Sequence, residues 1–160
     1  MKLKTKLTAL CAALLLAVAV SLTAAMLWQV REQSYEALLG STEETLNDLV
    51  DDFGTAVYRS PTDGLDPLAR KVLLTYCFRS CGVPGSALTV NGERLSASAQ
   101  IDPERYLDAR YGGIQSARAC VNGRHFLILG RVTDVWGMDC SVYLAADATY
   151  IYSQLWPVSY

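Results

Sequence analysis

An apolar run near the N-terminus is the feature that most constrains this chain. Residues 7–28, LTALCAALLLAVAVSLTAAMLW, are 22 residues without a charge, and Lys2, Lys4 and Lys6 precede them. A helix rises about 1.5 Å per residue, so this run covers the roughly 30 Å of bilayer hydrocarbon. We expect residues 7–28 to form a transmembrane helix. By the positive-inside rule, residues 1–6 would then lie in the cytoplasm and the rest of the chain outside it.

A cleaved signal peptide is the alternative, because it also begins with basic residues and an apolar stretch. Thr23, Ala24 and Ala25 would suit cleavage, but the run is longer than the usual signal core of about 7 to 15 residues. Cys11 would suit a lipoprotein, but Leu10 stands before it where a small residue is expected. A retained anchor, with Cys11 as a buried thiol, is therefore favoured.

The chain after the apolar run is long enough for one domain with its own hydrophobic core, which we place at residues 29–155. Without the three N-terminal lysines, eleven basic residues face sixteen acidic ones, a net charge of −5. An acidic surface gains nothing from phosphate backbones, so we expect no nucleic-acid partner.

Four cysteines follow the apolar run, at Cys77, Cys81, Cys120 and Cys140. In an oxidising compartment an even number favours two disulfides, and the sequence does not decide among the three pairings. Zinc, with His125 as a further ligand, is an alternative, but a Cys-x-x-x-Cys spacing is a weak metal signal. Four buried free thiols are another alternative. We expect no metal and no cofactor.

Residues 30–58 carry apolar side chains at three- and four-residue steps without a proline, which predicts a long helix continuing out of the membrane. Gly40 and Ser41 are a candidate weak joint. Such an apolar stripe suits packing on a sheet or pairing with the same helix of a second copy, and the two are compatible. A second helix is expected at residues 67–81, capped by Asp66 and ended by Gly82. Its predicted buried residues are Leu68, Val72, Leu73, Tyr76 and Cys77.

The period then changes to that of strands. We expect a short helix at about residues 102–109, a final helix after the last strand, and Asn-Gly hairpin turns at 91–92 and 122–123. The expected strands are residues 87–90, 93–96, 114–121, 124–132 and 140–146. A five-stranded antiparallel sheet with helices packed against it is the simplest assembly, so the predicted fold class is α+β.

The second Asn-Gly turn fixes a register, because a two-residue turn pairs Val121 with Arg124. One face of the sheet then carries Ser116, Arg118, Cys120, His125, Leu127 and Leu129. The other carries Ala117, Ala119, Val121, Phe126 and Ile128. Since both faces are partly apolar, we expect the long helix on one and a pocket or smaller helices on the other.

These features together resemble the extracytoplasmic sensor region, of the PDC or Cache type, of bacterial two-component histidine kinases. Residues 142–155, VYLAADATYIYSQL, resemble the last sensor strand and the Asp-x-Thr helix that leads to a second membrane helix in such kinases. The resemblance implies a PAS-like sheet, an extracellular domain on a bacterial cell membrane, and a homodimer formed through the long helix. Residues 156–160 would begin the return to the membrane. No second apolar span and no ATP-binding motif follows, so the expectation is a sensing fragment.

No strong catalytic motif is present, since the chain lacks His-Glu-x-x-His, a Walker glycine loop and Gly-x-Ser-x-Gly. A sensor needs a concave site with a few convergent polar groups. Arg118 is the first candidate, because a guanidinium can hold a carboxylate or a phosphate by paired hydrogen bonds. The further candidates are His125, Tyr143, Asp134 and Trp136. Each of these also fits an edge charge or a satisfied core polar group.

The leading interpretation is therefore the sensing module of a membrane-bound histidine kinase. A small molecule or a protein would shift the sheet against the long helix, and the shift would cross the bilayer. The alternatives are the sensor domain of a chemoreceptor and an anchored or secreted structural protein that binds another envelope protein. Whether an enzyme is involved stays open, because the kinase activity would reside in the parent protein.

Overall fold

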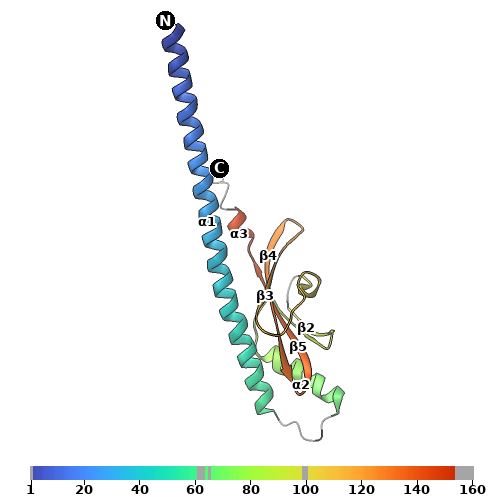
Figure 1. Cartoon of the computed structure of the whole chain (residues 1–160). Coiled ribbons are helices and arrows are strands. Elements are labelled where there is room, and N and C mark those ends of the chain that lie inside the picture. The colour runs from blue at the N-terminus through green and yellow to red at the C-terminus, as the bar shows by residue number, and fades with distance from the viewer. Residues whose placement is uncertain (1, 61–63, 65, 99–100, 154–160) are drawn as a thin grey trace.

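The structure, a computed structural model, describes residues 2–60, 64, 66–98 and 101–153. One helix, α1 (Lys2–Arg59), runs past the whole domain, and a five-stranded antiparallel sheet packs beside its C-terminal half (Figure 1). The predicted α+β class, the long N-terminal helix and the number of strands are confirmed.

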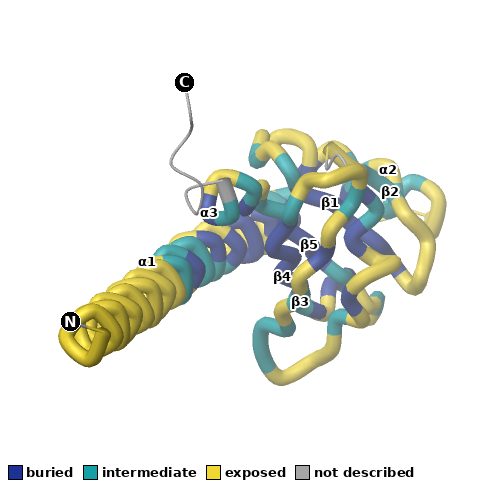
Figure 2. Tube along the Cα trace, turned by 90° about the horizontal axis from the view of Figure 1, so that it is seen from above, coloured by how far each residue is buried: buried dark blue, intermediate teal, exposed yellow. Residues whose placement is uncertain are grey.

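Helix α1 continues from the apolar run into the domain without a break, as predicted. Its N-terminal half projects alone and is exposed along its length (Figure 2). This half is long and apolar enough to cross a membrane, and none of its most apolar window is buried by the domain. Gly40 and Ser41 do not interrupt the helix, and the Thr42 hydroxyl donates to the Leu38 carbonyl at 2.6 Å just beyond them.

The second helix, α2 (Pro67–Ser80), begins as predicted, with the Asp66 carboxylate accepting from the Ala69 amide at 2.7 Å. Of its predicted buried residues, Cys77 is confirmed and Leu73 is half-buried, but Leu68, Val72 and Tyr76 are exposed. The buried residues of the helix are Leu74, Cys77 and Phe78. The helix carries two apolar stripes, and the one that contains Phe78 faces the core. There the Phe78 ring packs edge-on against Phe53 of α1, with centroids 5.7 Å apart.

The sheet contains β1 (Ser86–Val90), β2 (Glu93–Ala97), β3 (Gln115–Val121), β4 (Arg124–Val135) and β5 (Met138–Asp147), in the order β2-β1-β5-β4-β3. Both predicted Asn-Gly turns are present, with positive φ at each residue. Strands β4 and β5 are longer than predicted, because Trp136 and Gly137 make a third two-residue turn, at φ 54° and 79°. A bulky residue rarely adopts positive φ, so the sequence pattern indicated a longer loop here.

Two short helices complete the fold: the 3₁₀ turn η1 (Pro103–Arg105) and α3 (Thr149–Ser153). The helix predicted at residues 102–109 is wrong beyond this one turn. The chain leaves it at Leu107, whose side chain is buried in the small core on that face of the sheet. The final helix is confirmed at residues 149–153. The predicted return to the membrane at 156–160 lies outside the described residues.

The predicted register is confirmed, since Val121 pairs with Arg124 and Arg118 with Leu127. It separates two hydrophobic cores. The larger core joins α1, α2 and α3 to the sheet face that carries Leu127 and Leu129. The smaller core lies on the opposite face, beneath residues 101–109, and consists of Ala87, Ile101, Leu107, Ala119, Phe126, Ile128 and Tyr143. Both faces of the sheet are therefore covered, as predicted.

Candidate functional site

A groove of about 760 Å³ lies on the sheet face away from α1, between the strands and residues 104–111. This volume is within the range of about 300–1,000 Å³ that is usual for small-molecule sites. The strands supply its floor, and the segment after η1 supplies its outer wall. The residues that line the groove are Thr89, Asn91, Gly92, Arg94, Glu104, Leu107, Asp108, Ala109, Arg110, Tyr111, Val132, Asp139, Ser141 and Tyr143.

The floor is mostly apolar at its centre. Tyr143, which is buried, lies there with Leu107 and Val132. Gly130 is the cross-strand partner of Tyr143, and a Cβ at this glycine would lie 3.0 Å from both Leu107 Cδ2 and Tyr143 Cδ1. The absence of a side chain at Gly130 therefore lets the tyrosine ring and the leucine pack together over β4.

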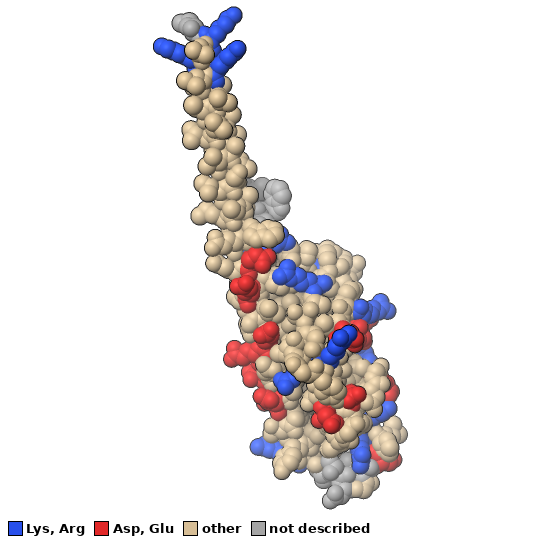
Figure 3. Space-filling model, in the orientation of Figure 1, with Lys and Arg blue, Asp and Glu red and all other residues tan. Residues whose placement is uncertain are grey.

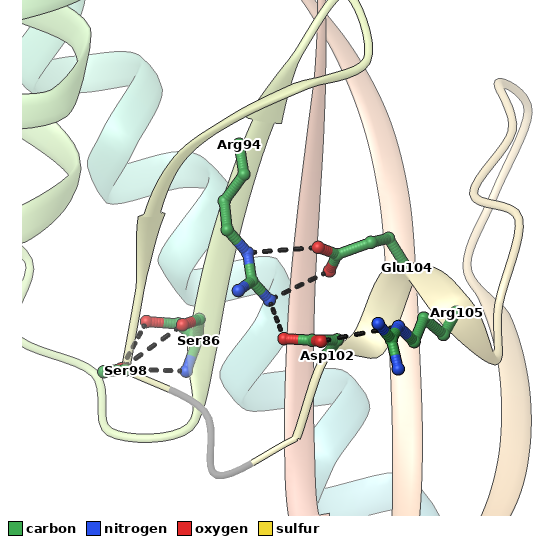
Figure 4. Close-up of polar contacts among 6 residues, drawn as sticks. All are labelled: Ser86, Arg94, Ser98, Asp102, Glu104 and Arg105. Atoms are coloured by element: carbon green, nitrogen blue, oxygen red, sulfur yellow. Dashed lines mark hydrogen bonds and ion pairs between the residues drawn. The ribbon is translucent and has the colours of Figure 1, made fainter.

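The outer wall is held by an ion-pair network (Figure 4). The Arg94 guanidinium on β2 makes a fork with the Glu104 carboxylate, at 3.0 and 3.2 Å, and also contacts Asp102 at 2.9 Å. Asp102 in turn contacts Arg105 at 3.5 Å. The Arg94 side chain is 36% exposed, so these bonds are partly screened by water. Their main effect is to tie the 3₁₀ turn to the sheet edge and so to position the wall.

One end of the groove is acidic. The Tyr111 hydroxyl donates to the Asp139 carboxylate on β5, and this bond raises the pKa of Tyr111 to about 12. The Asp139 backbone is fixed by two hydrogen bonds with Asn91. The backbone N–H of Asn91 donates to the Asp139 carbonyl, and the side-chain oxygen of Asn91 accepts from the backbone N–H of Asp139. Asp134 on β4 is directly opposite Asp139 in the register. Two carboxylates facing each other across a strand pair repel.

Thr89 on β1 is the buried polar residue of the floor. It is 7% exposed, and its hydroxyl oxygen has no hydrogen-bond partner. It lies at an irregularity of the ladder, where Leu88 pairs with Ser96 but Thr89 pairs with Arg94. An unpaired buried hydroxyl lowers the stability of the fold by about 1–3 kcal/mol, so a hydrogen bond from a ligand to this hydroxyl would be favourable.

A second cluster lies where α1 passes α3. The His125 ring on β4 stacks on the Tyr152 ring, with centroids 3.7 Å apart and planes at 13°. The Arg31 guanidinium of α1 lies 4.0 Å from the centre of the same ring. Both groups approach within 4.0 Å, so they occupy opposite faces of Tyr152. We call these three residues the Tyr152 stack. It connects α1, β4 and α3.

Arg118 lies beside the Tyr152 stack, over a second ring. Its guanidinium is 3.6 Å from the centroid of Tyr35, which is on α1 and only 5% exposed. Burial raises the pKa of Tyr35, against the opposing effect of Arg118. The Arg118 side chain therefore makes a cation–π contact that attaches edge strand β3 to the helix.

The start of α3 is fixed by a small capping arrangement. The Asp147 carboxylate accepts from the Thr149 amide at 2.9 Å, and the Thr149 side chain, followed by this amide, lowers the pKa of Asp147. The Thr149 hydroxyl accepts from the His125 amide at 3.0 Å, and the Ala148 amide donates to the His125 carbonyl at 2.7 Å. His125 thus holds α3 through its backbone as well as through its ring.

The five candidate ligand residues are therefore divided between two places. Tyr143 lines the groove, and Asp134 lies opposite Asp139 at its acidic end. Arg118 and His125 are on the other face, where they contact aromatic rings. Trp136 lies in the β4–β5 turn and packs against the larger core.

The four cysteines predicted to form disulfides are free thiols in the structure. Cys77 and Cys81 are one helical turn apart at the C-terminal end of α2, and burial raises the pKa of Cys81. Cys140 is buried in β5, where desolvation and then the charges of Asp134 and Asp139 raise its pKa to about 12. Cys120 is exposed on edge strand β3. In the part of the chain that the structure describes, no three His, Cys, Asp or Glu side chains gather as metal ligands.

Sequence reasoning missed Thr89, Arg94, Glu104, Tyr111 and Asp139 as groove residues. A signal for Asp139 was present, because Asp139, Ser141 and Tyr143 alternate along one strand and so share a face. The predicted strand began one residue too late to include it. Tyr111 and Glu104 reach the groove because of the path of residues 101–111. The apolar residues of this segment follow neither a helical nor a strand period, so its path could not be predicted.

Comparison with known proteins gives no match: no family model, no curated protein and no solved structure is significantly similar to this chain.

Proposed function

We propose that this chain is the sensing module of a membrane-bound receptor, with the groove as the site that takes the signal. The observation that carries the proposal is the arrangement of the two sheet faces. One face forms a groove of ligand size, and the other packs on a helix that continues into an apolar segment long enough to span a bilayer. A ligand-induced change on one face thus has a short route to the membrane.

The route begins at β5. This strand supplies Ser141 and Tyr143 to the groove and leads, through Asp147, into α3. Tyr152 of α3 is held between Arg31 of α1 and His125 of β4. A shift of β5 would therefore change the position of α3 against α1 at the Tyr152 stack. A transmitted signal requires an element with two arrangements, and we propose the Tyr152 stack for that role.

A sensor histidine kinase is the parent protein that we propose. The strand order β2-β1-β5-β4-β3, with a long N-terminal helix on one face and a groove on the other, resembles the PAS-like sheets of PDC and Cache sensors. Basic side chains gather at the far tip of α1 (Figure 3), where Lys2, Lys4 and Lys6 stand, and they favour a cytoplasmic N-terminus with the domain outside the cell. The bacterial membrane is proposed from the resemblance alone. A chemoreceptor would share this arrangement.

The contact within a homodimer is better placed in residues 7–28 than beside the domain. The apolar stripe of α1 from Leu46 to Val57 is buried against the sheet. The outer face that remains is acidic (Figure 3). Its exposed acidic residues are Glu36, Glu44, Asp48, Asp51 and Asp52. Two such faces would repel each other, whereas the projecting segment is free of charge.

A second function, docking to another envelope protein, is favoured by one observation. Leu68, Val72 and Tyr76 form an exposed apolar stripe along α2, with exposures of 71%, 63% and 72%. Contiguous apolar surface of this kind often marks an interaction site.

Reading the coding DNA immediately beyond Tyr160 separates these functions. An apolar span followed by kinase motifs supports the histidine kinase, and a methyl-accepting coiled coil supports the chemoreceptor. A stop codon at this point contradicts both receptors and leaves the anchored interaction protein.

The orientation is tested by labelling intact cells with a membrane-impermeant maleimide. Cys120 is exposed on β3 and should react, whereas the Cys120→Ser variant should lose most of the label. Labelling of Cys120 that requires permeabilised cells would contradict an extracellular domain.

A further inference from the structure

We propose that the groove takes a small organic ammonium ion with an apolar body, held at the end where Tyr111 bonds Asp139. This inference deepens the proposed function, on which it rests, by assigning a ligand class to the same site. It depends on the charge of the lining, on the unpaired hydroxyl of Thr89 and on the apolar floor.

The charges of the lining leave one carboxylate without a cationic partner. Of the two lining arginines, Arg94 is bonded to Glu104 and Asp102, and Arg110 lies 3.7 Å from Asp108. The remaining lining carboxylate, Asp139, accepts from a neutral phenol. The cross-strand neighbour of Asp139 is Asp134, a second negative charge. A cation at this end would relieve the repulsion between the two, whereas an anion would increase it.

Thr89 is the second and independent observation. Its side chain lines the groove, is more than nine-tenths buried, and carries the unpaired hydroxyl. A rotation of about 120° about χ1 moves the hydroxyl to another of the three staggered positions. Thr89 pairs with Ser141, which stands two residues from Asp139 on the same face of β5. An ammonium group bound at Asp139 therefore has a hydroxyl acceptor along the same floor.

The rest of the floor indicates an organic cation and not a bare metal ion. Tyr143, Leu107 and Val132 offer apolar surface, and the Tyr111 and Tyr143 rings offer π faces that attract ammonium groups. A metal ion needs several oxygen or nitrogen ligands around one point. No such group of side chains occurs among the residues that the structure describes.

The test uses the full chain in nanodiscs of a neutral lipid, with methyl NMR signals of Thr89, Leu107 and Val132 as reporters. Three probes share one carbon chain and differ in their end group: n-butylammonium, n-butanol and n-butyrate. We expect saturable shifts of the groove methyls with n-butylammonium and none with the other two. Empty nanodiscs serve as the control for partition of the amine into lipid.

Two variants and a matched control locate the site. Asp139→Asn keeps an acceptor for Tyr111 but removes the charge, and it should weaken n-butylammonium binding by about tenfold or more. Thr89→Val should weaken binding about threefold and yet raise the midpoint of thermal unfolding, because it deletes the unpaired hydroxyl. Glu93→Gln is the matched control, because it also removes one negative charge, but in an ion pair with Lys71 outside the groove. It should change neither the affinity for n-butylammonium nor the midpoint of thermal unfolding.

The outcomes that overturn the inference are distinct from failure of the proposed function. Groove shifts with n-butyrate in place of the amine would show a ligand site of the wrong charge class. Saturable shifts with calcium chloride and none with the amine would show a metal site, and no shift with any probe would also reject the ammonium class. The receptor itself is rejected by a different result, a stop codon directly after Tyr160.

Discussion

The two faces of the sheet are covered in different ways. On the face that packs against α1, the strands share a continuous apolar core with the helices α1, α2 and α3. Leu46, Phe53, Leu74 and Leu129 are fully buried in it. On the opposite face a thin segment without regular helix lies over a smaller core and leaves the groove open beside it. We therefore expect the helix face to be the more rigid part of the domain and the groove face to be the more adaptable one.

Matched phenylalanines on the two faces give the largest expected effect. Phe53→Ala removes a ring that is 0% exposed and in contact with Phe78, so it should lower the free energy of unfolding by about 3–5 kcal/mol. Phe126→Ala, on the groove face, should cost roughly half as much, because its covering layer is thin and can collapse into the space. Urea unfolding of the full chain in nanodiscs measures both. Equal losses would refute the contrast between the faces.

The Gly130→Ala variant tests how far the side chains on the groove face can move. The added methyl group would meet the side chains of Leu107, in the thin covering segment, and Tyr143, on β5, at 3.0 Å. We expect a loss of only about 1 kcal/mol, because these side chains can move outward. The methyl signal of Leu107 should shift while that of Leu129, on the helix face, stays in place. A loss as large as that of Phe53→Ala would show that the groove face is as rigid as the other.

Acid should weaken the contact of Asp147 with Thr149, between β5 and α3. We expect this effect to be smaller than those of the phenylalanine and Gly130 variants. The pKa of Asp147 is lowered from 3.8 by its bonds to Thr149, so the folded state prefers the charged carboxylate. This contribution is complete above pH 3.8 and disappears as the pH falls through the lower folded value. The Thr149 amide signal should follow that titration, and Asp147→Asn should abolish it. A Thr149 signal that titrates at or above 3.8 would contradict the assignment.

Periodicity and turn chemistry predicted most of the scaffold. The apolar stripe predicted α1, and two Asn-Gly pairs predicted two hairpins and the pairing of Val121 with Arg124. Those signals are local, because they depend on residues within one turn of helix or on one pair of strands. The hairpin between β4 and β5 was not predicted, because Trp136 adopts a positive φ that is typical of Gly or Asn in such turns.

The candidate site was harder to predict, because it depends on contacts between distant segments. Tyr111 and Asp139 are 28 positions apart, and Arg31 and Tyr152 are still farther apart in the sequence. Arg118 and His125 were correctly placed on one face of the sheet, but the side chains that they contact there are Tyr35 and Tyr152. A register states which face a residue is on. It does not state what covers that face.

The unbroken course of α1 has one more consequence. Its 58 residues form a rod of about 87 Å, in which successive side chains are about 100° apart around the axis. If residues 7–28 span a bilayer, as proposed above, a rotation of the helix by one residue step at Tyr35 would present a different set of side chains to the lipid. Rotation about the helix axis is then a motion by which the domain could act on the membrane-spanning segment.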